Sequence, residues 1–186
     1  MFEALIEYMA KKFIDLGFKK RSEQKKVDAK KDQLVGNECR SIEGIWICQY
    51  RYPRMDDKAG TKIQTTETQL VRFVQTSNRV NGETLFAAAR PEDFEGVVTK
   101  DRYFTGMYFN QKNHHSYHGA FQFIISHSAN RMNGKWIGFN REGDAVDSND
   151  WRWEQIDDNP NISKEKEHEY MSKAQSADLF SIEVFI

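Results

Sequence analysis

A five-residue unit recurs along the middle of the chain and restricts what the chain can fold into. The unit is an apolar residue, a spacer, a glycine, a spacer and a second, usually larger residue. It is clearest in Ile42–Trp46, Phe104–Tyr108 and Met132–Trp136, and looser in Val80–Thr84 and Phe94–Val98. Because side chains alternate between the two faces of a strand, the first, third and fifth residues share one face. That face carries apolar residues and one glycine in each of five segments.

The same alternation of apolar and polar residues extends from residue 42 to residue 156, broken by Asn, Gly, Asp and Ser. Such a pattern is typical of short strands joined by tight turns. We predict eight strands, at residues 44–52, 66–75, 79–87, 94–100, 103–110, 117–126, 131–139 and 146–155. Pro53 and Pro91 fall between these strands, where loops are expected because proline cannot donate to a ladder.

The number of strands and the repeated glycine together predict the architecture. A glycine in a strand usually marks a bend or a close backbone approach. Eight strands are also the number that closes into a small barrel, and closure removes the edges that an open meander would expose. We therefore predict a mainly β fold, an eight-stranded antiparallel up-and-down lipocalin-like β-barrel. A flat sandwich with ordinary hairpin glycines is the alternative.

The chain divides into three parts on this interpretation. Residues 1–41 are an N-terminal amphipathic helix and a basic linker, with apolar side chains at helical spacing in the first four turns. Residues 42–156 are the β-barrel domain. Residues 157–186 are a C-terminal helix, expected at 163–179, and a short alternating strand. The basic linker is either a solvated extension or part of a helix that lies on an anionic membrane or a partner.

Composition limits the class of protein. The net charge of −1 does not indicate DNA or RNA binding. The two cysteines lack metal-type spacing, and no signal peptide or membrane-spanning run is present. We therefore expect a cytoplasmic protein, peripheral to the inner membrane if the N-terminal helix lies on lipid. Whether the protein forms a homo-oligomer is left open.

The shared face of the strands is rich in aromatic residues. Its members are Trp46, Tyr50, Tyr52, Phe73, Phe104, Tyr108, Phe121, Phe123, Trp136, Trp151 and Trp153. These rings could fill the barrel, but the polar groups of tyrosine and tryptophan near one mouth favour a stacking site for a flat ligand. The candidate ligand-binding residues are Tyr50, Tyr52, Tyr108, Trp136 and Trp153 for rings, with Arg54, Arg152 and His118 for phosphates or other contacts at the mouth.

Motifs for catalysis and for metal or cofactor binding are missing from the sequence. There is no Gly-x-Ser-x-Gly nucleophile motif, phosphate loop or dinucleotide fingerprint. His114, His115 and His118 lie in an expected hairpin region without a further ligand, and Asp144, Asp147 and Asp150 miss the spacing of a calcium loop. We expect no enzymatic activity, no metal and no cofactor.

Several segments also resemble a known group of proteins. The stretches "GIWICQYRY", "VRFVQTSNRVNGETLF", "FEGVVTKDRYFTGMYF", "ANRMNGKWIGFN" and "NDWRWEQI" are similar to lipocalin-like, calycin-type bacterial barrels. More narrowly, they resemble the β-barrel effectors of cyclic-oligonucleotide antiviral (CBASS) systems. The resemblance covers residues 42–156 and implies binding of a cyclic dinucleotide. Those effectors also carry two N-terminal transmembrane helices, whereas this chain carries one amphipathic basic helix.

The resulting hypothesis is a sensor barrel for a cyclic di- or oligonucleotide second messenger in bacterial antiviral signalling. Ligand binding would be passed to the N-terminal helix, a membrane surface or a protein partner. Two alternatives stay open: a carrier or sensor of an apolar small molecule, and an interaction module with a filled barrel.

Overall fold

The computed structural model describes residues 39–56, 60–87, 90–112, 118–139 and 146–181. These residues all belong to one compact unit, Cys39–Ile186. The expected N-terminal helix lies outside the described residues, as do residues 182–186 of the expected C-terminal strand.

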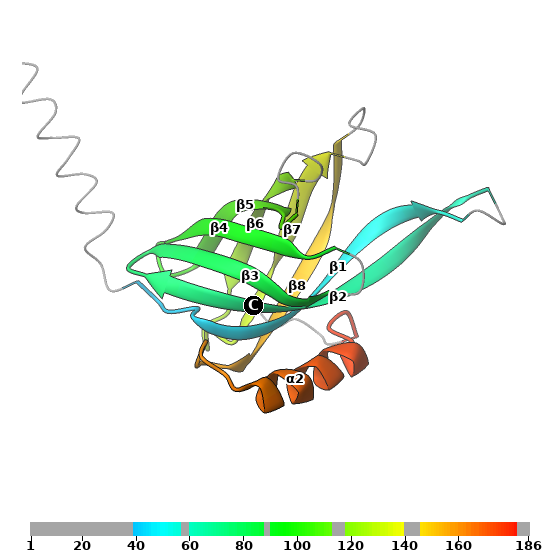
Figure 1. Ribbon diagram of the computed structural model, residues 1–186. Helices are drawn as coiled ribbons and strands as arrows, with labels where there is room; N and C mark the ends of the chain where they lie inside the picture. The colour runs from blue at the N-terminus through cyan, green and yellow to red at the C-terminus, as the bar shows by residue number, and fades with distance from the viewer. Residues whose placement is uncertain (1–38, 57–59, 88–89, 113–117, 140–145, 182–186) are drawn as a thin grey trace, which may run out of the picture. The chain divides into compact units, whose positions relative to one another are not determined.

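Eight antiparallel strands form a closed barrel in the order β1-β2-β3-β4-β5-β6-β7-β8, with β8 pairing back onto β1 (Figure 1). The strands are β1 (Gly44–Met55), β2 (Lys62–Thr76), β3 (Arg79–Ala87), β4 (Glu92–Thr99), β5 (Tyr103–Asn110), β6 (His118–Ile125), β7 (Arg131–Phe139) and β8 (Val146–Asp157). The predicted barrel and its strand order are confirmed, and three predicted strands, 79–87, 103–110 and 131–139, have the observed bounds.

The first two strands are longer than the sequence predicted. The pairing of β1 with β8 ends at Tyr50↔Trp151, and the pairing of β2 with β3 ends at Gln69↔Ala87. Among the described residues, 51–55 and 62–66 therefore pair only with each other and project beyond the other strands (Figure 1). We call this two-stranded ribbon the β1–β2 arm.

The expectation that Pro53 lies in a loop was wrong, because Pro53 is inside β1 and pairs with Gln64 of β2. Proline is tolerated in strands that have an open edge, where a missing N–H group need not break a ladder. In the β1–β2 arm, each strand has such an edge. Pro91 precedes β4, as predicted.

One helix covers part of the outer surface of the barrel. Helix α2 (Lys164–Ser176) begins after Ser163, whose side chain accepts a hydrogen bond from the backbone N–H of Lys166. Tyr170 and Ala174 are its buried residues, and they form a cluster with apolar residues of β1 and β2 that point outward. The helix expected at 163–179 is confirmed and is three residues shorter at its C-terminal end.

The segment after α2 is attached to the outer face of β1. The side-chain amide of Gln49 accepts from the backbone N–H of Leu179 and donates to the carbonyl of Ala177, both over 2.7 Å. Leu179 is buried, and the ring of Phe180 lies 3.9 Å from the Arg51 guanidinium carbon. Gln49 is consequently buried although it points away from the interior.

Candidate functional site

One end of the barrel is closed by the chain that leads into β1, and we call it the sealed end. The Arg40 guanidinium donates to the carbonyl of Ser126 over 2.7 Å, and the backbone N–H of Arg40 donates to Asp101. The carbonyl of Ile42 accepts from the indole Nε1 of Trp46 over 2.9 Å, and Ile42 is fully buried. Residues 39–43 therefore occupy this end, and a ligand would have to enter elsewhere.

The middle of the barrel is filled by aromatic side chains. Phe73, Phe94, Phe104 and Trp153 are each at most 2% exposed. The Phe73 ring lies 5.2 Å from Trp153 and 5.4 Å from Phe104, and Phe121 stacks on Phe123 with centroids 4.7 Å apart. The part of the interior next to the sealed end is therefore a packed core, consistent with the filling role that the sequence left open.

The repeated glycines make room for these rings. A Cβ atom on Gly82 would lie 2.5 Å from the Phe73 ring, and one on Gly96 would lie 2.6 Å from the Phe104 ring. A Cβ atom on Gly134 would lie 2.7 Å from the Phe123 ring. The sequence unit thus pairs an interior glycine with an aromatic ring from a neighbouring strand. A bend or a close backbone approach was predicted for these glycines, whereas the contact with a ring was not.

The opposite end of the barrel contains buried polar side chains, and we call it the polar end, defined by Glu67, Gln69 and Glu92. Glu92 is the first residue of β4 and is 1% exposed. Its Oε2 atom accepts a hydrogen bond from Nε2 of Gln69 over 3.0 Å. Gln69 also donates to the carbonyl of Arg90 over 2.9 Å and accepts from the thiol of Cys48 over 3.5 Å. These contacts fix the amide of Gln69 and, through it, the plane of the Glu92 carboxyl group.

Burial controls the ionisation of this cluster. The pKa of Glu92 is raised to about 8, chiefly by loss of hydration and also by nearby Glu67, whereas Gln69 and Arg90 act in the opposite direction. Burial likewise raises the pKa of the Cys48 thiol well above its ordinary value. At neutral pH, Glu92 is therefore mostly a neutral carboxylic acid, and Cys48 is a thiol.

Aromatic rings surround the polar cluster. The ring of Trp151 makes edge contacts with Tyr50 and Tyr108, with centroid separations of 5.2 and 5.4 Å. Tyr52 follows at 5.8 Å from Tyr50, and the guanidinium carbon of Arg90 lies 5.4 Å from the centre of the Tyr52 ring. A flat ligand that reached Glu92 would therefore meet aromatic faces and edges on several sides.

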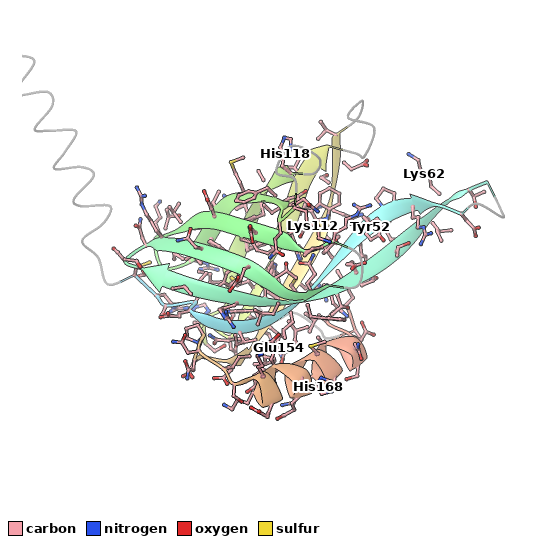
Figure 2. All side chains as sticks on the ribbon, in the orientation of Figure 1. Tyr52, Lys62, Lys112, His118, Glu154 and His168 are labelled. Atoms are coloured by element: carbon pink, nitrogen blue, oxygen red, sulfur yellow. The ribbon has the colours of Figure 1, made fainter. Side chains whose placement is uncertain are left out.

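Four of the eight predicted site residues come together at the polar end. Tyr50 and Tyr108 share contact with Trp151, and Tyr52 contacts Tyr50. Figure 2 shows Tyr52 at the base of the β1–β2 arm. Trp136 belongs to the same end, because its Nε1 atom donates to the carbonyl of Arg51 over 3.1 Å, just beyond the last β1–β8 pair.

The other four predicted residues take no part in these contacts. Trp153 is inside the packed aromatic core, between Phe73 and Phe123. Arg152 points outward, donates to the carbonyl of Leu179 over 2.9 Å and so holds the segment after α2. Arg54 is exposed on the β1–β2 arm, and His118 is half-buried at the start of β6, opposite the outward-facing Phe109. The structure does not bring these four residues together around one ligand site.

Sequence reasoning missed the polar residues of the interior. Glu67 and Gln69 lie in the predicted strand 66–75 and share the parity of Phe73, so the alternation could have identified them. Glu92 was missed because the predicted strand began at Phe94, two residues too late. Attention to aromatic residues alone thus left out Glu92, a carboxyl group that is almost completely buried.

Within the described ranges, no three His, Cys, Asp or Glu side chains converge as a metal site would require. In that same part of the chain, no helix has the length and hydrophobicity needed to cross a bilayer. His114, His115 and Asp144 lie outside the described residues.

The fold and site together define a class, a closed eight-stranded antiparallel β-barrel with one sealed and one polar end. Comparison with known proteins adds no family to this class, since no protein-family model, curated protein or solved structure matches the chain.

Proposed function

We propose that the protein is a receptor barrel that binds a small planar ligand at its polar end. The observation that carries this proposal is Glu92, a carboxyl group buried among aromatic rings at the end of the barrel that residues 39–43 do not close. Burying such a group opposes folding unless it is compensated, so its presence favours a role in recognition over a role in stability.

A nucleotide-type second messenger, such as a cyclic dinucleotide, is our first candidate ligand. Its base would lie against Tyr50, Tyr108 and Trp151, because bases stack readily on aromatic side chains. Its phosphates would stay outside the barrel, since Glu67 and Glu92 occupy the interior and every lysine and arginine in the described ranges is at least partly exposed. In the described part of the chain, Arg54, Arg90 and Lys112 are basic residues near that end.

The direct test is a thermal-shift panel of cyclic dinucleotides, fatty acids and haem, followed by calorimetric titration of each compound that shifts the unfolding temperature. At one hundred times its dissociation constant, a ligand stabilises the folded state by about 2.7 kcal/mol. We expect cyclic dinucleotides to stabilise the protein and Tyr52→Ala to weaken that effect. Tyr103→Ala, which changes a half-buried tyrosine on the outward face of β5, is the matched control.

A shift with fatty acids alone would replace the nucleotide proposal by the carrier or sensor of an apolar molecule. The absence of a shift with every compound would favour a second candidate function, an interaction module with a filled barrel. The ring contacts among Phe73, Phe104, Phe121, Phe123 and Trp153 favour that second candidate, because they show that much of the interior is packed without a ligand.

We further propose that ligand binding changes how the N-terminal segment associates with a membrane surface, a protein partner or a second copy of the chain. This step rests on the sequence of residues 1–41, with its amphipathic and basic pattern. Flotation with liposomes, with and without anionic lipid and the ligand, tests it. Failure to float under all conditions would restrict the output to protein partners.

A further inference from the structure

The hydrogen bonds of the Glu92 carboxyl group leave one of its oxygens available. Oε2 accepts from Gln69, whereas Oε1 has no donor among the residues that the structure describes. A carbonyl-type oxygen has two lone pairs, so Oε2 can accept a second hydrogen bond. Since Gln69 donates to Oε2, the proton of the neutral carboxylic acid belongs on Oε1. The group therefore presents one donor and one acceptor, side by side.

We propose that Glu92 recognises a planar ligand through two parallel hydrogen bonds to an edge with a ring-nitrogen acceptor beside an N–H donor. Adenine and cytosine bases and simple aminopyridines present such an edge. The inference rests on the proposed receptor function and names the ligand chemistry of the same site. Oε1 donates to the ring nitrogen, and Oε2 accepts from the exocyclic amine.

The surroundings of Glu92 favour this edge over one with two donors, such as that of guanine. Two donors would require an ionised carboxylate, which burial and nearby Glu67 both disfavour. Gln69 acts as a positioning residue, because its amide is held by Cys48 and by the carbonyl of Arg90 and cannot rotate without losing both contacts. The plane of the carboxyl group is thus set before a ligand arrives.

Tyr52 provides the route by which a ligand would reach Glu92. It lies beyond Tyr50, the last residue of β1 that pairs with β8, so it can shift without breaking the barrel ladder. Its ring is half-buried, with the Tyr50 ring centroid at 5.8 Å and the Arg90 guanidinium carbon at 5.4 Å. Displacement of these two neighbouring side chains would open the polar end to a ring.

The experiment measures the affinity of the full chain for two pairs of compounds. The first pair is cyclic di-adenosine and cyclic di-guanosine monophosphate, and the second pair is 2-aminopyridine and aniline. Aniline has the amine donor but lacks the ring-nitrogen acceptor. We expect the adenine compound to bind at least about tenfold more tightly than the guanine compound. We expect the same ratio for 2-aminopyridine over aniline. Glu92→Gln keeps a donor beside an acceptor, so its affinity for the adenine compound should stay within a few-fold of the wild-type affinity. Glu92→Met lacks both groups, and its affinity should fall by about tenfold or more. Glu95→Met, on the outer face of β4, is the matched control.

The pH dependence of binding to the wild-type protein is a second test, and it does not depend on whether a variant folds. Ionisation removes the Oε1 donor, so binding of the adenine compound should weaken as the pH rises through about 8. Among the described residues, the other titratable or charged groups near this carboxyl are Glu67, Cys48 and Arg90, with Tyr108 two residues along neighbouring β5 from the partner of Glu92. Glu92→Gln retains all four, so a pH effect that persists in this variant would overturn the assignment to Glu92.

The outcomes separate this inference from the receptor function. Equal or tighter binding of the guanine compound, or unchanged binding in Glu92→Met, overturns the inference and leaves the receptor intact. Binding of 2-aminopyridine but of neither dinucleotide supports recognition by Glu92 and removes the nucleotide function. If none of the four compounds binds, both proposals fail.

Discussion

The Oε2 atom of Glu92 accepts a hydrogen bond from Nε2 of Gln69 over 3.0 Å inside the barrel, where both residues are at most 1% exposed. The bond connects β4 to β2, which are separated by β3 in the barrel. It partly compensates the burial of a carboxyl group, but it does not remove the electrostatic consequence of that burial. The pH dependence of folding should therefore report on this pair.

Glu92 should make the protein less stable as the pH rises. Its carboxyl group has a pKa of about 8 when folded and an ordinary value of 4.5, so between these values the folded state keeps a proton that the unfolded state has released. Each pH unit in this window should lower the free energy of unfolding by up to about 1.4 kcal/mol relative to Glu92→Gln. The difference should become constant above pH 8. Urea unfolding of both proteins from pH 4.5 to 9 measures it.

Glu95→Gln is the control for this pH series, because it removes an exposed carboxyl group from the same strand. Its profile should run parallel to that of the wild type. Parallel profiles for wild type and Glu92→Gln would contradict the conclusion that burial raises the pKa of Glu92.

Gln49 should determine how firmly the segment after α2 is held. Gln49→Ala removes the hydrogen bonds to the N–H of Leu179 and the carbonyl of Ala177, and it leaves the buried N–H without its acceptor. We expect a loss of about 1–3 kcal/mol in the free energy of unfolding. Amide exchange at Leu179 should also become faster, which hydrogen-exchange NMR can detect. Gln122→Ala, which removes an exposed glutamine from β6, should change neither quantity appreciably.

Much of the fold could be predicted because alternation and strand number depend on local sequence. The parity of Trp46, Tyr50 and Phe73 correctly gave the interior face. Alternation could not predict the length of the β1–β2 arm, because neither face of the arm is buried against a neighbouring sheet. The outward position of Arg152 followed from parity, but its contact with Leu179 depends on how a distant segment docks.

The polar end was harder to predict than the barrel. Tyr50, Tyr52, Tyr108 and Trp136 were identified from their chemistry, but Glu92 becomes a site residue only through its hydrogen bond with Gln69 across β3. Such a contact depends on the stagger of the strands around the barrel, which the sequence does not specify residue by residue.

Gly82 should tolerate no side chain while Phe73 is present. In Gly82→Ala the new Cβ would lie 2.5 Å from the Phe73 ring and 3.2 Å from the Cβ of Phe94. We expect a loss of about 1–3 kcal/mol in the free energy of unfolding, as is usual for overpacked cores. Phe73→Leu removes the ring, so the double variant should be more stable than the sum of the single effects predicts. Asn81→Ala, at the exposed neighbouring position, is the control, and additive effects in the double variant would contradict the clash.

Trp46 and Trp153 should respond differently to replacement by phenylalanine. Both indoles are at most 2% exposed, but Nε1 of Trp46 donates to the carbonyl of Ile42 over 2.9 Å, whereas Nε1 of Trp153 reaches no acceptor in the described part of the chain. Both substitutions remove a similar volume, so the difference between them isolates the hydrogen bond that anchors the sealed end. We expect Trp46→Phe to reduce the free energy of unfolding by about 1 kcal/mol more than Trp153→Phe does. Chemical denaturation of the two variants measures this difference, and equal losses would show that the Trp46–Ile42 hydrogen bond contributes nothing to closure of that end.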